Sequence, residues 1–360
     1  MSQRKRMLNK KYVKTMLQYL VILLDDTSVA YCHAENPLTE RHLIPLETLR
    51  KAILFGMKEN LMIQYVLPEY ELPEEYKEVM ESIDNVKIGG GDVRVVNGLG
   101  TETSSAPTME DDVALSSDAG EDTRAPRVDE TPTLPRNMVL RLKIRELIEK
   151  QYDIALMLGQ VERLNICLTD IEAFTDELIE PYKKALSTLN AVLVGLYKQG
   201  KQPQVNILTD RLQLTEMHNC GAGISNITLA PNGRFYLCPA FYYDEQMGVD
   251  NRLQHTHIEC SRSVGDLDKG IEIPNRQLLT LERAPLCRKC DAYHCNRCIW
   301  LNQRLTWDSN TPSRQQCVLA HLERNAAREL QKMLREAGFG FADEIKEIGY
   351  LDPFEVREEN

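Results

Sequence analysis

The chain has 360 residues, 42% of them hydrophobic and 27% charged, and a formal net charge of −11. This length allows two or three domains with substantial cores, and the ordinary apolar fraction excludes a wholly disordered or collagen-like chain. The acidic balance argues against a nucleic-acid partner, because phosphate binding requires a basic surface. No apolar stretch is long enough to span a bilayer or to act as a secretory signal. We therefore expect a cytoplasmic protein with no membrane partner.

Short apolar runs alternate with amphipathic segments in the first hundred residues. Tyr19–Leu24 and Met62–Leu67 are predicted as buried strands. Pro45–Asn60 has helical spacing, and Pro73–Ile83 is predicted as a second, shorter helix. Val86–Val96 is predicted as a weak strand or a hairpin, interrupted by three glycines. This alternation indicates βαβ units and a parallel sheet.

The composition changes at residues 97–137, where Thr, Ser, Pro, Gly, Asp and Glu dominate. Such a segment buries too little apolar surface to offset its ordering entropy, so we predict a disordered acidic insertion. The predicted elements after it are a helix, a strand, a long helix and a strand: Met138–Leu158, Arg163–Leu168, Phe174–Gln199 and Gln204–Leu208. We expect residues 1–215 to form an α/β fold, an open or incomplete barrel that carries this insertion.

Eight of the ten cysteines lie between Cys220 and Cys317. In a reducing compartment such crowding indicates metal binding or catalysis rather than disulfides. Between Cys220 and Cys238 the sequence predicts a β-hairpin, because Asn232-Gly233 supplies the positive φ angles of a tight turn. Two CxxC pairs and a distant cysteine follow: Cys287, Cys290, Cys295, Cys298 and Cys317. Thiolates two residues apart converge readily on zinc or iron.

Seven thiolates exceed one four-ligand site and are one short of two. One closed centre and one three-cysteine centre fit this number. The gap of four residues between the CxxC pairs is shorter than the ~15–20 residues typical of a zinc ribbon. The spacing therefore favours iron–sulfur clusters, with zinc as the alternative.

The pattern Cys-x12-Gly-x4-Cys, followed by these CxxC pairs and a distant cysteine, resembles the SPASM domain of radical SAM peptide maturases. The segments CNRCIWLN and TPSRQQCVLAHLERNAARELQ resemble the branch called CXXX repeat peptide maturases. The resemblance covers roughly residues 215–330, and the N-terminal half more loosely. It implies a degenerate or partial radical-SAM-like (β/α) barrel and a SPASM-like domain over 216–325 with a β-hairpin and short helices. The residues that follow, 326–360, are expected to form a C-terminal helix and an acidic tail.

The resemblance also implies cofactors and a partner. It implies one or two 4Fe–4S clusters and a ribosomally synthesised, cysteine-repeat precursor peptide. The barrel edge or a SPASM strand is a candidate site for the precursor's leader, by strand addition. The ligands that the resemblance implies are Cys220, Cys238 and Cys298 for one cluster, and Cys287, Cys290, Cys295 and Cys317 for the other.

One signature of radical SAM enzymes is missing. Their Cys-x3-Cys-x2-Cys loop follows the first strand, but here only Cys32 is present, and Asp25 and Val29 occupy the other two positions. Valine does not bind iron, and aspartate is a hard ligand for a thiolate-held cluster. The Gly-Gly-Glu turn expected after the second strand is replaced by Leu67-Pro68-Glu69-Tyr70-Glu71. S-adenosylmethionine is therefore not expected as a cofactor.

Two routes to function remain open from the sequence. The protein acts as an iron–sulfur accessory subunit of a radical SAM partner enzyme, or it catalyses alone through the open iron of the three-cysteine centre. The alternative from another class is a zinc-stabilised, non-catalytic peptide-binding or adaptor protein. Whether the chain is an enzyme is thus left uncertain.

Several further Cys and His residues have simpler interpretations. Cys32 is interpreted as a vestigial, half-buried cysteine, and Cys167, among apolar neighbours, as a core thiol. His255 and His257 are expected in a polar loop, where Cys260 is a candidate eighth ligand.

The last helix is predicted to begin near Ser313, which forms a capping box with Gln316. Cys317 then lies near the positive end of the helix dipole, which favours a thiolate. His321, one turn further, is expected to be a surface histidine. An apolar stripe should dock the helix onto the body: Leu319, Leu322, Leu330, Met333 and Leu334.

Overall fold

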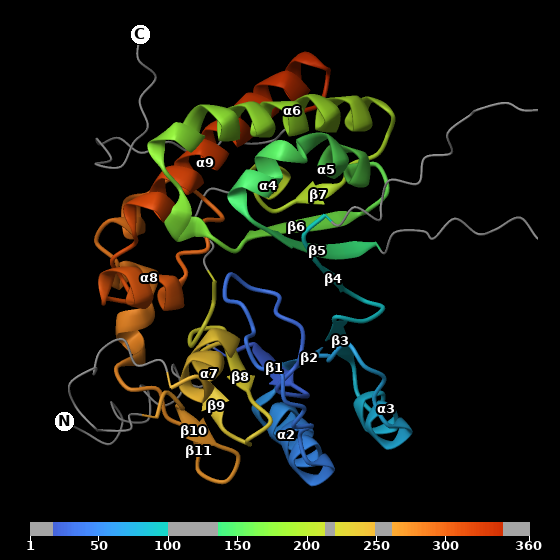
Figure 1. Cartoon of the computed structure of the whole chain (residues 1–360), viewed down its shortest axis with the longest axis vertical. Helices are drawn as coiled ribbons and strands as arrows, with labels where there is room; N and C mark the ends of the chain where they lie inside the picture. The colour runs from blue at the N-terminus through green and yellow to red at the C-terminus, as the bar shows by residue number, and fades with distance from the viewer. Residues whose placement is uncertain (1–16, 100–135, 213–219, 249–260, 341–360) are drawn as a thin grey trace, which may run out of the picture.

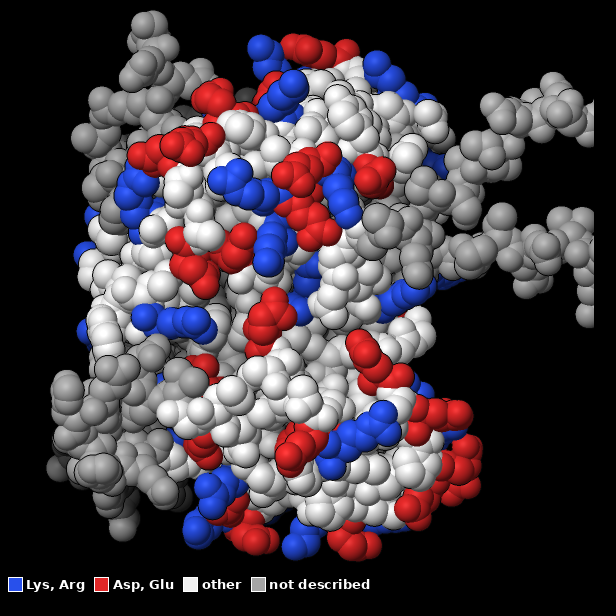
Figure 2. Space-filling model, viewed as in Figure 1, with Lys and Arg blue, Asp and Glu red and all other residues white. Residues whose placement is uncertain are grey.

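The computed structural model describes residues 17–99, 136–212, 220–248 and 261–340, and it is a mixed α/β structure with parallel sheets (Figure 1). None of the helices in these ranges combines the length and the apolar content needed to cross a membrane. The face seen in Figure 2 carries both signs of charge, with acidic side chains gathered around the short helix at residues 74–80.

A five-stranded sheet holds the N-terminal strands. Its order is β3-β2-β1-β8-β9, and all neighbours are parallel except β8 and β9, which form an antiparallel hairpin. The strands are β1 (Tyr19–Leu23), β2 (Met62–Val66), β3 (Asn85–Ile88), β8 (Asn226–Leu229) and β9 (Phe235–Tyr236). The hairpin turn contains Gly233 at a φ of 76°, as the Asn-Gly pair predicted.

A second sheet of four parallel strands has the order β4-β5-β6-β7. Its strands are β4 (Arg94–Asn97), β5 (Asn137–Leu142), β6 (Arg163–Leu168) and β7 (Gln204–Val205). A parallel bridge between Ile88 and Val93 joins β3 to the segment before β4. The bridge is parallel, not the antiparallel contact of a hairpin, and it places the edge of β3 beside the segment that enters β4.

Helices cover both sheets (Figure 1). The longest two, α6 (Ile179–Lys198) and α9 (Arg314–Glu336), pack against each other, and Asn190 Nδ2 of α6 donates to the Ala326 carbonyl of α9 at 2.8 Å. The other helices are α2 (Leu46–Glu59), α3 (Glu74–Met80), α4 (Ile144–Glu149), α5 (Gln151–Leu158), α7 (Pro239–Gln246) and α8 (Ile299–Thr306). Two short strands, β10 (Gly265–Asp266) and β11 (Gly270–Ile271), form a separate antiparallel pair.

Single-turn 3-10 helices occupy several connections between these elements. They are 171–173, 176–178, 209–211, 276–279, 281–283 and 287–289. The first two precede α6, so the long helix begins at Ile179 and not at Phe174 as predicted.

One predicted helix is wrong at its start. Met138–Leu158 was expected to be helical throughout, but Asn137–Leu142 forms strand β5, and the helices begin only at Ile144. The segment is an almost continuous apolar run in which five of six residues are buried. Such a run fits a parallel strand covered on both faces as well as it fits a buried helix, so periodicity alone does not separate the two.

The β8–β9 hairpin lies beyond the boundary expected near residue 215, yet β8 pairs with β1 in the first sheet. The boundary itself falls within residues 213–219, outside the described residues. Most of the predicted acidic insertion, residues 100–135, also lies outside them. Helix α9 begins as predicted, since the Ser313 side chain accepts a hydrogen bond from the Gln316 amide at 3.2 Å.

Candidate metal centre

Four cysteines from separate segments lie close enough to interact electrostatically. Burial raises the pKa of Cys238, and the charges of Cys32, Cys298 and Cys220 raise it further. Burial also raises the pKa of Cys298, which Cys220 and Cys32 raise further. The three cysteines that the resemblance assigned to one cluster are therefore electrostatic neighbours in the structure, and Cys32 is a neighbour of them.

Each of these thiols stands at the start or end of a structural element. Cys32 lies in the loop after β1, and Cys220 lies shortly before β8. Cys238 precedes α7 and Cys298 precedes α8, each as the residue that caps the helix N-terminus. Cys220 is exposed and the other three are partly buried.

Backbone amides just downstream act on all four sulfurs. The Ala34, Ala222 and Ala240 amides oppose the rise in pKa of Cys32, Cys220 and Cys238, in that order. The Leu301 amide donates to Cys298 Sγ at 3.5 Å. Such donors favour the thiolate, which is the form that binds a metal, so they are the outer-shell interactions expected around thiolate ligands.

The Cys32 loop is fixed from the neighbouring sheet. Arg141 of β5 is only 3% exposed, and its guanidinium donates to the Cys32 carbonyl at 3.1 Å and to the Ala34 carbonyl at 3.0 Å. The next residue, His33, uses Nδ1 to contact the Leu168 carbonyl at 2.7 Å. The backbone around Cys32 thus has a defined position at the carboxyl ends of the strands.

The loop also contacts the second CxxC pair. His33 Nε2 lies 3.0 Å from Asn296 Nδ2, and the Cys220 amide donates to the Asn296 carbonyl at 2.9 Å. Asn296 lies between Cys295 and Cys298, so one residue joins the loops of three cysteines.

The other four predicted ligands are placed around the start of α9. Cys287 begins the 3-10 turn 287–289, and the Cys290 amide donates to the Cys287 carbonyl at 3.0 Å. Cys290 Sγ accepts from the Ala292 amide at 3.3 Å and lies 3.7 Å from His321 Nε2. Cys317 is in the first turn of α9.

His321 is not the surface histidine that was expected. It is only 1% exposed, because the 287–298 segment packs over this face of α9. The packing includes Arg324 Nη1 and Asp291 Oδ1, which lie 2.7 Å apart with both side chains buried. The sequence offered only the one-turn spacing from Cys317 as a signal, and burial depended on a partner segment distant in the chain.

Cys295 faces a different neighbourhood from Cys290. It lines a cavity of about 50 Å³ together with His33, Arg211 and Glu323. Burial raises the pKa of Cys295, while Arg211 opposes the rise. Arg211 Nη2 also pairs with Glu323 at 2.5 Å, so Cys295 stands beside a compensated buried ion pair.

In the described residues no three Cys, His, Asp or Glu side chains meet closely enough to hold a single metal ion. The predicted candidates His255, His257 and Cys260 lie outside these residues. Cys167 was predicted as a core thiol, and it is buried in β6 with its pKa raised by burial to about 12.

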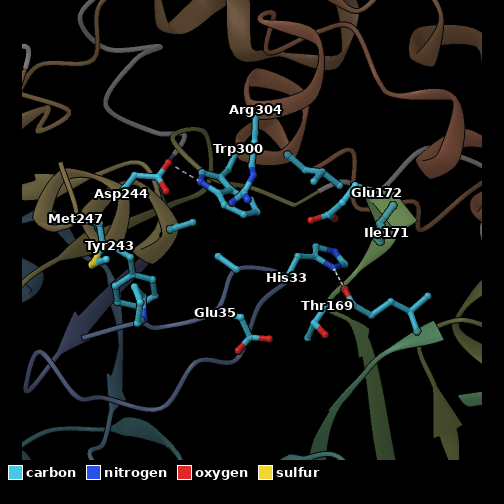
Figure 3. A pocket seen from close by; sticks show the side chains of 15 residues that line it. His33, Glu35, Thr169, Ile171, Glu172, Tyr243, Asp244, Met247, Trp300 and Arg304 are labelled. Carbon is cyan, nitrogen blue, oxygen red and sulfur yellow. Dashed lines mark hydrogen bonds between the residues drawn. The ribbon is translucent and has the colours of Figure 1, made fainter. Parts of the chain in front are cut away.

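A cavity of about 310 Å³ lies beside the Cys32 loop (Figure 3). Its walls come from this loop, from the segment after β6, and from α7 and α8, whose first residues follow Cys238 and Cys298. Trp300 Nε1 donates to Asp244 Oδ2 at 2.8 Å, and burial raises the pKa of Asp244. Apolar and charged side chains share the lining: Tyr243, Met247, Trp300, Glu35, Glu172 and Arg304.

The two positions at which radical SAM enzymes would have their other cysteines are built into the fold. Asp25 is fully buried, and its carboxylate accepts hydrogen bonds from the Thr27 amide at 2.8 Å and from the Tyr70 hydroxyl at 3.0 Å. The Val29 side chain packs against the core, and its amide donates to the Leu67 carbonyl at 3.0 Å. Tyr70 lies in the segment between β2 and α3.

A sequence signal for Cys32 was present but not used. Cys32, Cys220, Cys238 and Cys290 are each followed, two positions later, by alanine. Searches for related proteins gave no match, either among protein-family models or among curated proteins.

Proposed function

We propose that this protein is an iron–sulfur protein that takes part in the maturation of a ribosomally synthesised, cysteine-repeat peptide, without S-adenosylmethionine radical chemistry of its own. The observation that carries the proposal is the gathering of Cys220, Cys238 and Cys298 with backbone donors on their sulfurs. Thiolate ligands with amide donors are the environment that iron–sulfur clusters use.

The chemistry of the donor set suits a cluster. Thiolate is a soft ligand, and it suits iron–sulfur clusters and zinc. A single zinc ion holds four sulfurs at about 2.3 Å from one centre. A 4Fe–4S cluster places four irons between its thiolates and so accommodates thiols that interact without meeting at one point. When bound, such a cluster supplies electron transfer or an open iron site.

The loss of radical chemistry is supported by Asp25 and Tyr70. The Asp25 carboxylate is engaged by hydrogen bonds from its own loop and from Tyr70, so it is held away from the role of an iron ligand. A radical SAM partner enzyme is therefore proposed as the source of any radical step.

The peptide partner is proposed from the resemblance and from the cavity beside the Cys32 loop. In this cavity Trp300 and Tyr243 offer apolar surface, and Asp244 and Arg304 offer charge. This residue mixture suits a peptide segment, because an apolar lining with a few charged groups both buries and orients a ligand.

The first test is the metal content of protein purified without oxygen. We expect a brown protein with about four to eight irons and matching sulfide per chain, for one or two 4Fe–4S clusters. A colourless, air-stable protein that holds zinc and no sulfide would overturn the proposal and favour the zinc-stabilised adaptor.

The second test concerns S-adenosylmethionine. With a reductant and S-adenosylmethionine present, the reconstituted protein should release no more 5′-deoxyadenosine than a cluster-free sample. Release in proportion to turnover would show that the radical chemistry had been retained.

A further inference from the structure

Cys32 is held in the same kind of turn as the predicted ligands. The amide two residues downstream lowers the pKa of Cys32, as it does for Cys220 and Cys238. The same relation holds at Cys295 and Cys298, and at Cys290 the Ala292 amide donates to the sulfur at 3.3 Å. Cys32 therefore has the same local surroundings as the predicted ligands.

The position of this turn is enforced from outside the loop. Arg141 bonds the carbonyls on both sides of His33, and its Nη1 donates to Asn97 Oδ1 at 2.6 Å. A buried arginine that bonds backbone carbonyls of a surface loop fixes the thiol with little freedom. The contact of His33 with Asn296 connects the loop directly to the second CxxC pair.

Cys32 is also an electrostatic neighbour of the other three thiols. Among the charged neighbours of Cys238, Cys32 has the largest effect, ahead of Cys298 and Cys220. Cys32 and Cys220 act on Cys298 as well, and Cys220 acts on Cys32. Each of the four thiols therefore has the other three as neighbours, and residues that follow Cys32, Cys238 and Cys298 line one cavity.

We propose that Cys32 is the fourth protein ligand of the cluster held by Cys220, Cys238 and Cys298. The inference rests on the proposed iron–sulfur function, and it changes the expected three-cysteine centre with an open iron into a closed, four-thiolate centre. A closed cluster transfers electrons but offers no iron site to a substrate, so the protein would act as an electron-transfer partner in peptide maturation.

Cys167 provides the matched comparison. It is a neighbour of Cys32, and its sulfur lies 3.7 Å from His33 Nδ1. It differs in its setting, because it is buried within strand β6 and is followed by leucine and threonine instead of the Cys-x-Ala turn. Replacing it removes a thiol from the same region without touching the proposed ligands.

The experiment uses the full chain, reconstituted with iron and sulfide under anaerobic conditions. Iron, sulfide and the EPR spectrum of the reduced protein are measured for wild type and for Cys32→Ala, Cys238→Ala and Cys167→Ala. We expect Cys32→Ala and Cys238→Ala each to lose about four irons and four sulfides per chain, or to retain a three-iron signal. Cys167→Ala should match wild type.

A conservative variant separates ligation from folding. Cys32→Ser keeps an oxygen ligand, so we expect it to retain iron with a shifted EPR spectrum. Metal-free Cys32→Ala and metal-free wild type should unfold at similar urea concentrations, which excludes a folding defect as the cause of the loss.

Two results would overturn the inference while leaving the proposed function intact. One is a Cys32→Ala protein whose iron content, sulfide content and EPR spectrum are the same as those of wild type. The other is loss of the cluster in Cys167→Ala or Cys260→Ala instead, which would assign the fourth thiol elsewhere. A wild-type protein without sulfide would instead refute the proposed function itself.

Discussion

Arg141 is the side chain on which the Cys32 loop most depends. Its guanidinium is buried and donates to two loop carbonyls and to Asn97. A shorter, neutral side chain would leave these buried acceptors without donors, and each unsatisfied group costs about 1–3 kcal/mol. The loop geometry at Cys32 is therefore set by a residue 109 positions away.

We predict that Arg141→Gln lowers the free energy of unfolding by about 2–4 kcal/mol, because a buried charge-assisted network is broken. Urea denaturation of the metal-free protein measures the change. Arg145→Gln, at an exposed position on the same polypeptide segment, should change stability by no more than about 0.5 kcal/mol. Equal effects of the two substitutions would contradict the proposed role of Arg141.

Cys167 makes a pH-dependent contribution to stability. Burial raises its pKa from 9.0 to about 12 in the folded protein. Between pH 9 and pH 12 the Cys167 thiol loses its proton in the unfolded chain but keeps it in the folded chain. The contribution of Cys167 to the free energy of unfolding is therefore fully present below pH 9 and decreases as the pH rises toward 12.

We predict that Cys167→Ala removes part of this pH dependence. Metal-free wild type should lose about 1 kcal/mol more stability than Cys167→Ala when pH is raised from 8 to 10. Urea titrations at the two pH values give the difference. Ile166→Val, a neighbouring change without a titratable group, should lower the free energy of unfolding by the same amount at both pH values. If wild type and Cys167→Ala lose the same stability between pH 8 and pH 10, Cys167 is not the source of the pH dependence.

At the scale of elements, the loop that carries the CxxC pairs is attached to α9 by a buried ion pair. Asp291 contacts Arg324 and Arg328, each at 2.7 Å, and Asp291 is 1% exposed. Buried pairs are costly to break singly, because the remaining partner keeps an uncompensated charge. This pair holds Cys290 beside His321.

We predict that Asp291→Asn lowers the free energy of unfolding by about 3 kcal/mol. Adding Arg324→Met to Asp291→Asn should recover part of the lost stability, because the unpaired buried cation is then removed. Urea denaturation of the single and the double variant measures the two free energies of unfolding. Glu47→Gln, in an exposed pair with Arg50, should have an effect below about 0.5 kcal/mol. A double variant as unstable as the sum of its single changes would refute the coupling.

At the scale of the whole molecule, the C-terminal third completes structures begun by the N-terminal part. Strand β8 pairs with β1, and α9 covers α6. The Tyr182 hydroxyl of α6 donates to Glu323 Oε1 of α9 at 3.0 Å, with both side chains buried. Residues on either side of position 215 therefore share one core.

We predict that a fragment ending at residue 215 does not fold cooperatively. It would expose one edge of β1 and the apolar face of α6, and an exposed strand edge favours aggregation. The full chain should have a near-UV circular dichroism signal that is lost in a single urea transition. The fragment should have no such signal and no such transition. A fragment with a sharp, reversible transition would show that the two parts fold independently.

The sequence predicted many elements because their patterns were local. The strands at Tyr19, Met62 and Arg163 and the cap at Ser313 follow from short apolar runs and a capping box. The start of β5 was missed, because an apolar run that continues into helix α4 has no local feature to separate strand from helix.

The candidate site divides in the same way. The sequence by itself determined which cysteines stand in ligand-like spacing, because CxxC pairs and a hairpin are local features. Only the tertiary structure decided that Cys32 lies near enough to Cys238 and Cys298 to raise the pKa of both, and that His321 is buried beside Cys290. The physical reason is that these neighbours meet through sheet pairing and helix packing between distant segments, and spacing along the chain carries no record of such contacts.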